Sequence, residues 1–473
     1  MIQGLGAMRV IDASRAGVVP PRSPALAIAS VLAALMLVVL DAAIANVALP
    51  TLSRALHVTA ASSVLVVTAY QTALVMALLP CAALGESLGY RRVFVSGVAL
   101  FTVASALCAA APSLPWLVAA RFVQGLGAAA VMALGVALLR TVVPAHKLGM
   151  AIGWNALVVA LTSAAGPTIG ALILSLASWP WLFAVNFPVG LLVLAAAGAL
   201  PRVPGSARPL DPRSVALNLA AFALLVVGAE TLPSKPVLAG ALLVAGALSL
   251  AALVRRERPK AAPLIPIDLL RDRAFRLSVI ASVCCFTGQA AGMVALPFYL
   301  QHTLGLSPLL TGLYITPWPL MVAVAAPFAG RLAGPASTAW LCGAGGLCLS
   351  TGLAAAALWP LAGNPAAIIP IVLLCGLGFG LFQTPNNRNM FLAAPQERSG
   401  AAGGLQGAAR LSGQTAGVVV MTLLFSTAAI DAAPRLGLTI GAVLTLAAGL
   451  ISTRHRANPA QRAELGDGRR PRP

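Results

Sequence analysis

Long apolar runs alternate with short polar segments along almost the whole chain. Most runs have roughly twenty residues or more, the length that an α-helix needs to cross the hydrocarbon core of a bilayer. The pattern predicts fourteen membrane-spanning helices. Their ranges are 26–50, 62–84, 94–112, 116–139, 149–177, 179–200, 214–231, 236–254, 277–302, 309–330, 336–358, 366–384, 401–425 and 434–452. The spans 214–231 and 236–254 are the least secure, because the turn between them is very short.

The composition indicates a polytopic membrane protein and excludes a soluble enzyme. Only 9% of the 473 residues are charged and the mean hydropathy is +0.92, whereas about 25% of an ordinary soluble domain is charged. So few charges cannot cover a globular surface in water. The seven cysteines are scattered through the apolar runs without paired spacing. We interpret them as small apolar fillers, and not as a disulfide framework or a metal site.

The basic residues form short clusters between the runs, and their distribution predicts the orientation. Loops on the cytoplasmic side of a membrane carry an excess of Lys and Arg. With the N-terminus in the cytoplasm, 26 of the 31 basic residues fall in cytoplasmic segments, three fall on the opposite side, and Arg121 and Arg410 lie inside spans. This split predicts a multi-pass protein of the cytoplasmic (inner) membrane with both termini in the cytoplasm. It argues against a nucleic-acid partner, and the full-length first span argues against a cleaved signal peptide.

The order of the spans suggests two homologous halves joined by an inserted helical hairpin. We expect an all-α polytopic membrane protein with five parts. They are a cytoplasmic N-terminal segment (1–25), an N-terminal six-helix half (26–200), a central linker with two extra spans and a basic cytoplasmic loop (201–276), a C-terminal six-helix half (277–452) and a disordered cytoplasmic tail (453–473).

Asp41 is the first candidate for chemistry, because charge inside the hydrocarbon is costly and an intramembrane acid is a functional candidate by default. It follows a strongly apolar run, and further apolar-rich positions come after it. A carboxylate there can hold a proton: its neutral form is tolerated in an apolar cavity, and its ionised form needs water or a cation. The alternative is a helix-end Asp that reaches interfacial water.

Arg121 is the natural partner of Asp41. It lies about one turn inside the fourth span, which begins on the outer side, so both residues are expected at similar depths in the outer half of the membrane. Gly125 and Ala129 follow it at four-residue spacing, and such small residues let a neighbouring backbone approach closely. The alternative is an Arg that snorkels from the helix start.

Two further strings are candidates for conformational roles. The loop between the second and third spans, with Glu86, Gly89 and two Arg residues, could clamp neighbouring helix ends, or could only set the orientation. The fifth span carries Gly166, Pro167 and Gly170. The proline removes a backbone hydrogen bond and the glycines allow close packing, although ordinary kinked packing would use the same residues.

Taken in order, these strings resemble the signatures of the major facilitator superfamily, especially its fourteen-span drug:proton antiporter branch. The string LDxxxxNVALP from Leu40 is similar to the first-helix motif, GESLGYRR to the cytoplasmic loop motif, RFVQGLGAA to the fourth-helix arginine motif and GPxxG to the fifth-helix antiporter motif. WPW and NFPVG resemble the start of the sixth helix, and PWP, AGRLA and FQTPNN continue the match in the second half. The resemblance covers roughly residues 26–452.

The resemblance implies a major-facilitator-type fold whose two halves rock about substrate and proton sites between them. It assigns proton coupling to Asp41 with a supporting role for Arg121. It assigns gating to four residues of the loop motif, Glu86, Gly89, Arg91 and Arg92. It also identifies the fifth span as the helix that carries the antiporter motif, with Gly166, Pro167 and Gly170 as its motif residues. The family usually has Asp in place of Glu86 and Gly in place of Ala82. The corresponding loop motif of the second half, AGRLA, is followed by Gly334 where the family often has an Asp. The loop is therefore expected to hold the neighbouring helix ends more weakly than in typical relatives.

The function expected from the resemblance is export of lipophilic, cationic drugs in exchange for protons. The alternative is a proton-coupled exporter of one metabolite, siderophore or antibiotic on the same fold. A membrane-embedded enzyme finds no support in paired carboxylates, an HExxH string or a Ser/His arrangement. The expected partners are a small-molecule substrate, protons and the lipid bilayer, with no cofactor, the proton gradient as energy source, and a monomer as the working unit.

Substrate contacts are expected from the second half. Glu230 is either an interfacial residue or a second carboxylate for cations. The candidate cavity residues, for which packing is the alternative, are Phe286, Gln289, Tyr299, Trp318 and Gln383.

Overall fold

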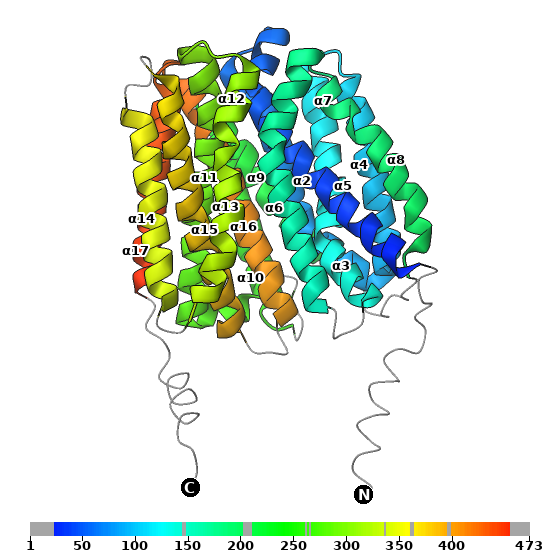
Figure 1. Cartoon of the computed structure of the whole chain (residues 1–473). Helices are drawn as coiled ribbons and strands as arrows, with labels where there is room; N and C mark the ends of the chain where they lie inside the picture. Colours follow the sequence, from blue (N-terminus) through cyan, green and yellow to red (C-terminus); the bar gives the residue numbers. More distant parts are fainter. Residues whose placement is uncertain are drawn as a thin grey trace, which may run out of the picture.

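The computed structural model is a bundle of long helices that run side by side (Figure 1). It describes residues 23–143, 148–201, 211–260, 263, 266–334, 337–359, 364–394 and 399–454, and in this part of the chain every regular element is helical. The described chain begins and ends on the same side of the bundle, which we call the terminal side, and the opposite side is called the far side. Much of the expected N-terminal segment and C-terminal tail lies outside the described residues.

The first half of the bundle comprises helices that start at capping side chains. Ser23 and Thr59 accept hydrogen bonds from the backbone N–H three residues on, and proline follows Ser23 directly, as is common at helix starts. The elements are α2 (Pro24–Ala55), α3 (Ala60–Leu88), α4 (Tyr90–Ala109), α5 (Leu114–Val142), α6 (Leu148–Leu176), α7 (Trp181–Ala184), α8 (Asn186–Ala196) and η2 (Ala197–Ala199).

A pair of helices and a second half follow. The pair is α9 (Pro212–Thr231) and α10 (Pro236–Glu257), so the short turn between the two least secure spans is confirmed. The later elements are η3 (Ile267–Arg271), α11 (Arg273–Phe298), η4 (Tyr299–Thr303), α12 (Pro308–Ile315), α13 (Pro317–Leu332), α14 (Ser337–Leu358), η6 (Pro365–Ala367), α15 (Ile368–Ala393), α16 (Ser399–Thr427) and α17 (Ala433–Thr453).

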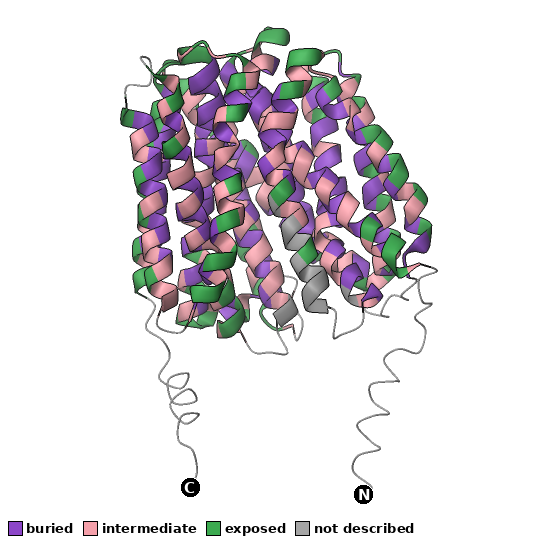
Figure 2. Cartoon of the chain, viewed as in Figure 1, coloured by how far each residue is buried: buried purple, intermediate pink, exposed green. Residues whose placement is uncertain are grey.

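The predicted all-α membrane fold is confirmed. In the described chain, thirteen helical segments are long and apolar enough to cross a membrane, and α6 adds the shorter apolar stretch Leu161–Leu176. Figure 2 shows buried residues inside the bundle and exposed ones along its outer helices and ends. Large apolar side chains such as Val237 and Trp340 are more than three-quarters exposed there, which suits a surface covered by lipid and not by water.

Several spans differ from the prediction in detail. Helices α2 and α3 extend beyond the apolar runs 26–50 and 62–84 at both ends, because capping residues and polar turns at the membrane surface continue them. The span 179–200 is divided at Val185 into α7 and α8, and the span 309–330 is divided at Thr316, next to Pro317. Proline explains the second break, since it cannot donate a backbone hydrogen bond.

The two halves meet along several helix pairs, including α2 with α11, α6 with α12 and α13, and α3 with α16. In the described chain, four hydrogen bonds join the halves, and all of them lie towards the far side. Three of these involve Gln301 and one joins Thr168 to Thr316. The far side is therefore the side on which the halves are fastened together.

Candidate functional site

Asp41 lies in the middle of α2, and both of its carboxylate oxygens are occupied. Arg121 Nη1 donates to Asp41 Oδ2 at 2.5 Å, while Gln124 Nε2 and Asn186 Nδ2 donate to Oδ1 at 3.0 and 2.7 Å. Asp41 and Arg121 are 1% and 0% exposed. The structure thus places a fully buried ion pair where the sequence predicted two charges at similar depth.

Arg121 is held by more than its ion pair. Its Nε donates to the Val66 carbonyl at 3.3 Å, its Nη1 also donates to Gln124 Oε1 at 2.6 Å, and the guanidinium lies 4.2 Å from the ring centre of Tyr70. A planar guanidinium can serve several acceptors and stack on an aromatic face at once. These contacts fix the orientation of Arg121, which does not snorkel to the membrane surface.

Close backbone contact explains why these side chains meet. A Cβ at Gly125 would overlap with the Tyr70 carbonyl and Ala73 of α3, so only glycine lets α5 lie this close to α3. The expectation that small residues after Arg121 admit a neighbouring backbone is therefore confirmed for Gly125. Helix α5 consequently presents Arg121 across α3 to the carboxylate on α2.

The arrangement suits a carboxylate whose proton state controls its neighbours. An ionised Asp41 holds Arg121, Gln124 and Asn186 together, and charge-assisted hydrogen bonds of this kind are roughly twice as strong as neutral ones. Adding a proton removes the negative charge that neutralises Arg121 in a buried place, where an unpaired charge is costly. Protonation would therefore loosen α2 from α5 and α8.

The antiporter-motif helix packs directly beside this network. A Cβ at Gly166 would overlap with the Cβ of Ala43, and a Cβ at Gly170 would lie 3.3 Å from the Cα of Ile44, both on α2 close to Asp41. On its other face, the Pro167 carbonyl lies against Gly312 of α12, in the second half. This helix therefore touches the Asp41 helix and the opposite half at the same level.

The four predicted gating residues lie where α3 meets α4 on the terminal side. Glu86 is in the last turn of α3, and Gly89 joins the helices with φ +97°, a left-handed conformation that favours glycine. Arg91 Nε donates to the carbonyl of Ala197 at the end of the sixth span, at 3.2 Å, whereas Arg92 is exposed. The loop thus clamps one neighbouring helix end through Arg91, and its gating role stays a prediction.

The five predicted cavity residues separate into two groups. Phe286, Tyr299 and Trp318 are buried in an apolar core that consists mainly of second-half residues and also includes residues of α2 and α3. Phe286 packs edge-on against Phe379, and the Tyr299 hydroxyl accepts a bond from Arg435. Gln289 and Gln383 are half-buried. The aromatic residues therefore lie in a packed apolar core, and the two glutamines remain the better candidates for cargo contacts.

A second polar contact, which the sequence did not reveal, fastens the halves on the far side. Gln301, in the π-helical turn η4, donates to the Val47 carbonyl at 3.1 Å and accepts from Arg54 at 3.2 Å and from Thr51 at 3.5 Å. Single π-turns are frequent at functional positions. We call Gln301 and these three partners on α2 the far-side latch.

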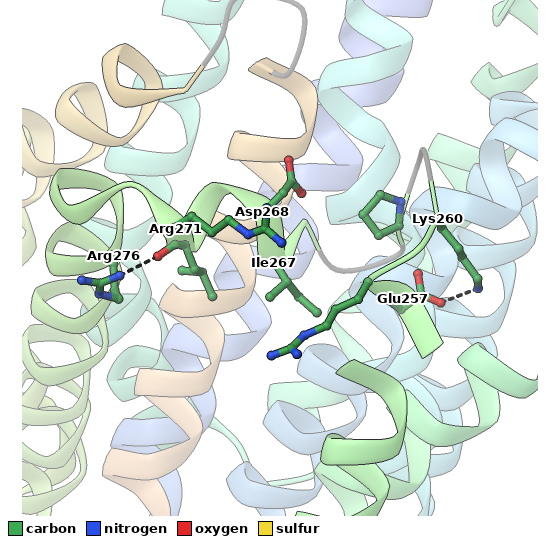
Figure 3. A pocket seen from close by; sticks show the side chains of 9 residues that line it. Glu257, Lys260, Ile267, Asp268, Arg271 and Arg276 are labelled. Carbon is green, nitrogen blue, oxygen red and sulfur yellow. Dashed lines mark hydrogen bonds and ion pairs between the residues drawn. The ribbon is translucent and has the colours of Figure 1, made fainter. Parts of the chain in front are cut away.

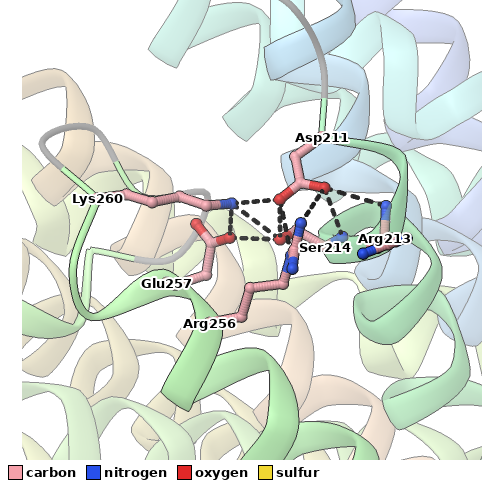
Figure 4. A network of polar contacts seen from close by, with 6 residues as sticks. All are labelled: Asp211, Arg213, Ser214, Arg256, Glu257 and Lys260. Atoms are coloured by element: carbon pink, nitrogen blue, oxygen red, sulfur yellow. Dashed lines mark hydrogen bonds and ion pairs between the residues drawn. The ribbon is translucent and has the colours of Figure 1, made fainter.

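A polar cluster joins the central helices on the terminal side (Figure 4). Asp211 caps α9 and accepts bonds from Arg256 Nε at 2.8 Å and Lys260 Nζ at 2.6 Å, and these bonds hold the pKa of the Asp211 carboxyl well below its ordinary value. Ser214 and Lys260 both donate to the buried carboxylate of Glu257 at 2.5 Å. The cluster ties the start of α9 to the end of α10.

A neighbouring cavity of about 480 Å³ lies between this cluster and the start of α11 (Figure 3). Its charged lining residues include both signs, and Arg276 donates to the Leu270 carbonyl at 3.0 Å. The cavity is at the terminal face, remote from Asp41. Its lining residues are Glu257, Arg258, Lys260, Pro263, Ile267, Asp268, Leu270, Arg271 and Arg276.

The sequence revealed the charged pair but not the residues that complete it. Gln124 follows Arg121 by three positions, which places both on one helix face, and Asn186 lies in the sixth-helix string. Those two spacings could have suggested amide partners for the carboxylate. Tyr70 and Val66 carry no signal of their own, because their contacts depend on the packing of α3 against α5.

Comparison of the sequence with known protein families identifies its superfamily. The model of the Major Facilitator Superfamily matches residues 31–418, which is most of the chain. The chain belongs to this superfamily. It is a membrane transporter by family, so the expectation that it is not an enzyme agrees with the assignment.

Relatives in this superfamily include transporters with different named cargoes. The chain is 42% identical over 445 residues to the uncharacterized transporter YebQ of Escherichia coli, covering 92% of this chain and 96% of that protein. It is 34% identical to the multidrug resistance protein Stp of Mycobacterium tuberculosis (82% and 73% covered) and 28% identical to the riboflavin transporter RibZ of Clostridioides difficile (77% and 80% covered).

Proposed function

We propose that the protein is a proton-coupled secondary transporter that exports lipophilic compounds by alternating access, with Asp41 as the coupling carboxylate. The observation that carries the proposal is the buried Asp41–Arg121 pair, sealed by Gln124 and Asn186. An ion pair this deep costs free energy to desolvate and is a weak way to gain stability. A role in proton exchange would explain why the buried Asp41–Arg121 pair is present although it contributes little to stability.

The contacts between the halves support a transport cycle. The four hydrogen bonds that join them in the described chain lie towards the far side, which fits a state closed on that side. Protonation of Asp41 would weaken its hold on α5 and α8 while α2 also carries Val47, Thr51 and Arg54 of the far-side latch. A shift of α2 would therefore transmit the proton state to the latch.

The carboxylates in the interior of the protein bear on the charge of the cargo. A cationic drug, expected from the sequence, would need a free carboxylate in the interior. Both oxygens of Asp41 are already bonded to protein groups. Glu230 has a buried Oε1 without a hydrogen-bond partner in the described chain, but it lies near the far end of α9, whose main contacts are with α3, α10 and α16 and not with α2 or α11. Because Asp41 has no free oxygen for a cation, a lipophilic cargo without a positive charge is the better match.

The riboflavin transporter among the relatives favours a second candidate, an exporter of one metabolite on the same fold. Uptake driven by a proton gradient into inverted membrane vesicles tests both candidates. Accumulation of several unrelated lipophilic compounds supports multidrug export, and accumulation of a single compound supports the second candidate. If collapse of the proton gradient leaves uptake unchanged, proton coupling is wrong for both.

A further inference from the structure

Arg410 is a half-buried cation of the bundle, and its Nε has no hydrogen-bond partner among the described residues. It lies on α16, eleven residues or about 17 Å from the start of the helix at 1.5 Å per residue. The residue as a whole is half-buried, its Nε is shielded from solvent, and no described residue accepts a hydrogen bond from it. A guanidinium at this depth is costly unless an acceptor or an anion satisfies it.

The position of Arg410 on α16 is at the seam between the halves. Gln406 and Gln414 lie one turn before and after it, so the three side chains share one helix face. Gln406 donates to Asn387 of α15 at 3.2 Å, which directs this face towards α15. The adjacent residue Leu411 belongs to the apolar core of the first half, together with Leu74 and Leu78 of α3.

Other unsatisfied polar atoms occur on the helices at this seam. In the described chain, Gln71 Oε1 and Thr72 Oγ1 on α3 and Thr415 Oγ1 on α16 are buried without a hydrogen-bond partner. Buried polar groups are nearly always paired, so each exception calls for a partner. Helices α3 and α16 pack against each other, and the two threonine hydroxyls on them could donate hydrogen bonds to a bound anionic group.

The chain itself has little with which to neutralise Arg410. Of its twelve acidic residues, only Asp41 and Glu230 fall within the predicted apolar spans. Asp41 is paired with Arg121, and no ion pair joins Glu230 to Arg410 in the described structure. An anion that comes from outside the chain could balance the charge.

We propose that Arg410 is a cargo-binding residue and that the cargo carries an anionic group, such as a carboxylate or a sulfonate. The proposal rests on the transport function above and specifies its substrate class. The lipophilic part of the cargo lies between the halves, and its anionic group accepts hydrogen bonds from the guanidinium. Such charge-assisted pairs with Arg are directional and strong.

Binding of two dyes with one ring system tests the proposal without any proton gradient. Purified protein in detergent is titrated at pH 8 with anionic fluorescein and with cationic rhodamine 123, and binding is followed by fluorescence anisotropy. Wild type binds fluorescein the more tightly. Arg410→Gln weakens fluorescein binding by about tenfold or more, as expected for loss of a buried charge partner, and leaves rhodamine 123 binding unchanged or stronger. Arg410→Lys restores part of the affinity.

Arg388→Gln is the matched control, because Arg388 is an exposed arginine near the terminal end of α15. It leaves both affinities unchanged. The proposal is overturned if wild type does not prefer fluorescein, or if Arg410→Gln keeps the wild-type affinity for it. Since binding needs no gradient, such a failure leaves proton-driven uptake intact and is distinct from failure of the transport function.

A second measurement does not depend on the dye. Because an unpaired guanidinium in the bundle costs free energy, Arg410→Met raises the unfolding temperature of the cargo-free protein, whereas Arg388→Met does not. A lowered unfolding temperature for Arg410→Met would mean that Arg410 holds the fold together, and this too would contradict the proposal.

Discussion

At the scale of single residues, geometry and not charge alone defines the Asp41 network. Arg121 serves Asp41, Gln124 and the Val66 carbonyl while lying over the Tyr70 ring. A lysine has the same charge, but its single ammonium group cannot reach these acceptors in one plane. The sequence could predict the pair, because charges inside apolar runs stand out. It could not predict the amides, which become partners only through helix packing.

The first prediction follows from that geometry. Arg121→Lys abolishes most proton-driven transport although it keeps the positive charge, since about 1.5–3 kcal/mol is lost for each broken hydrogen bond to a charged group. Uptake by proteoliposomes at matched protein levels is the measurement. Arg388→Lys, at an exposed arginine near the terminal end of α15, serves as control and keeps most of the uptake. Wild-type uptake by Arg121→Lys would show that the position needs only a charge.

At the scale of helices, small residues decide which elements can meet. Gly166 and Gly170 let α6 lie against α2, and Gly312 lets α12 accept the Pro167 carbonyl. The sequence predicted close packing for this motif, but a motif cannot name the helix on the other side. The thirteen spans found in the described chain could be predicted because apolar runs of about twenty residues are a strong signal. The breaks at Val185 and Thr316 were not predicted, although Pro317 beside Thr316 is a signal for the second one.

Gly166→Ala tests the contact between α6 and α2. A methyl group there would overlap with Ala43, so the helices must separate, and overpacking of this kind typically costs about 1–3 kcal/mol. We expect a lower unfolding temperature and reduced transport. Gly198→Ala is the matched control, because a Cβ at Gly198 has no neighbour within 4 Å. Equal stability of the two variants would mean that α2 and α6 do not depend on this contact.

At the scale of the whole molecule, the far-side latch and the Asp41 network share α2. Gln301 contributes three of the four described hydrogen bonds that join the halves. Its role was invisible in the sequence, because a lone glutamine near a helix end carries no pattern. The basic-residue split predicts that the terminal side is cytoplasmic, and on that prediction the latch would close the outer side.

Gln301→Ala should therefore shift the population towards a state open on the far side. A cysteine placed at Ala45, which is 1% exposed, should react faster with a membrane-impermeant maleimide added outside intact cells when Gln301→Ala is also present. The same cysteine with Gln301 intact is the reference. An unchanged labelling rate would show that Gln301 does not hold the halves together.

The central claim is that Asp41 couples proton movement to transport, and Asp41→Asn tests it most directly. Asparagine keeps the size of the side chain and one acceptor oxygen, but it cannot titrate and has an NH2 donor in place of the second acceptor. Wild-type and variant proteoliposomes at matched protein levels are given the same pH gradient, and accumulation of a transported compound is compared with exchange of that compound in the absence of a gradient. The account predicts that Asp41→Asn loses gradient-driven accumulation while exchange persists, and that Glu230→Gln keeps both. Accumulation by Asp41→Asn against the concentration gradient would contradict the account and move the coupling to Glu86 or Glu230.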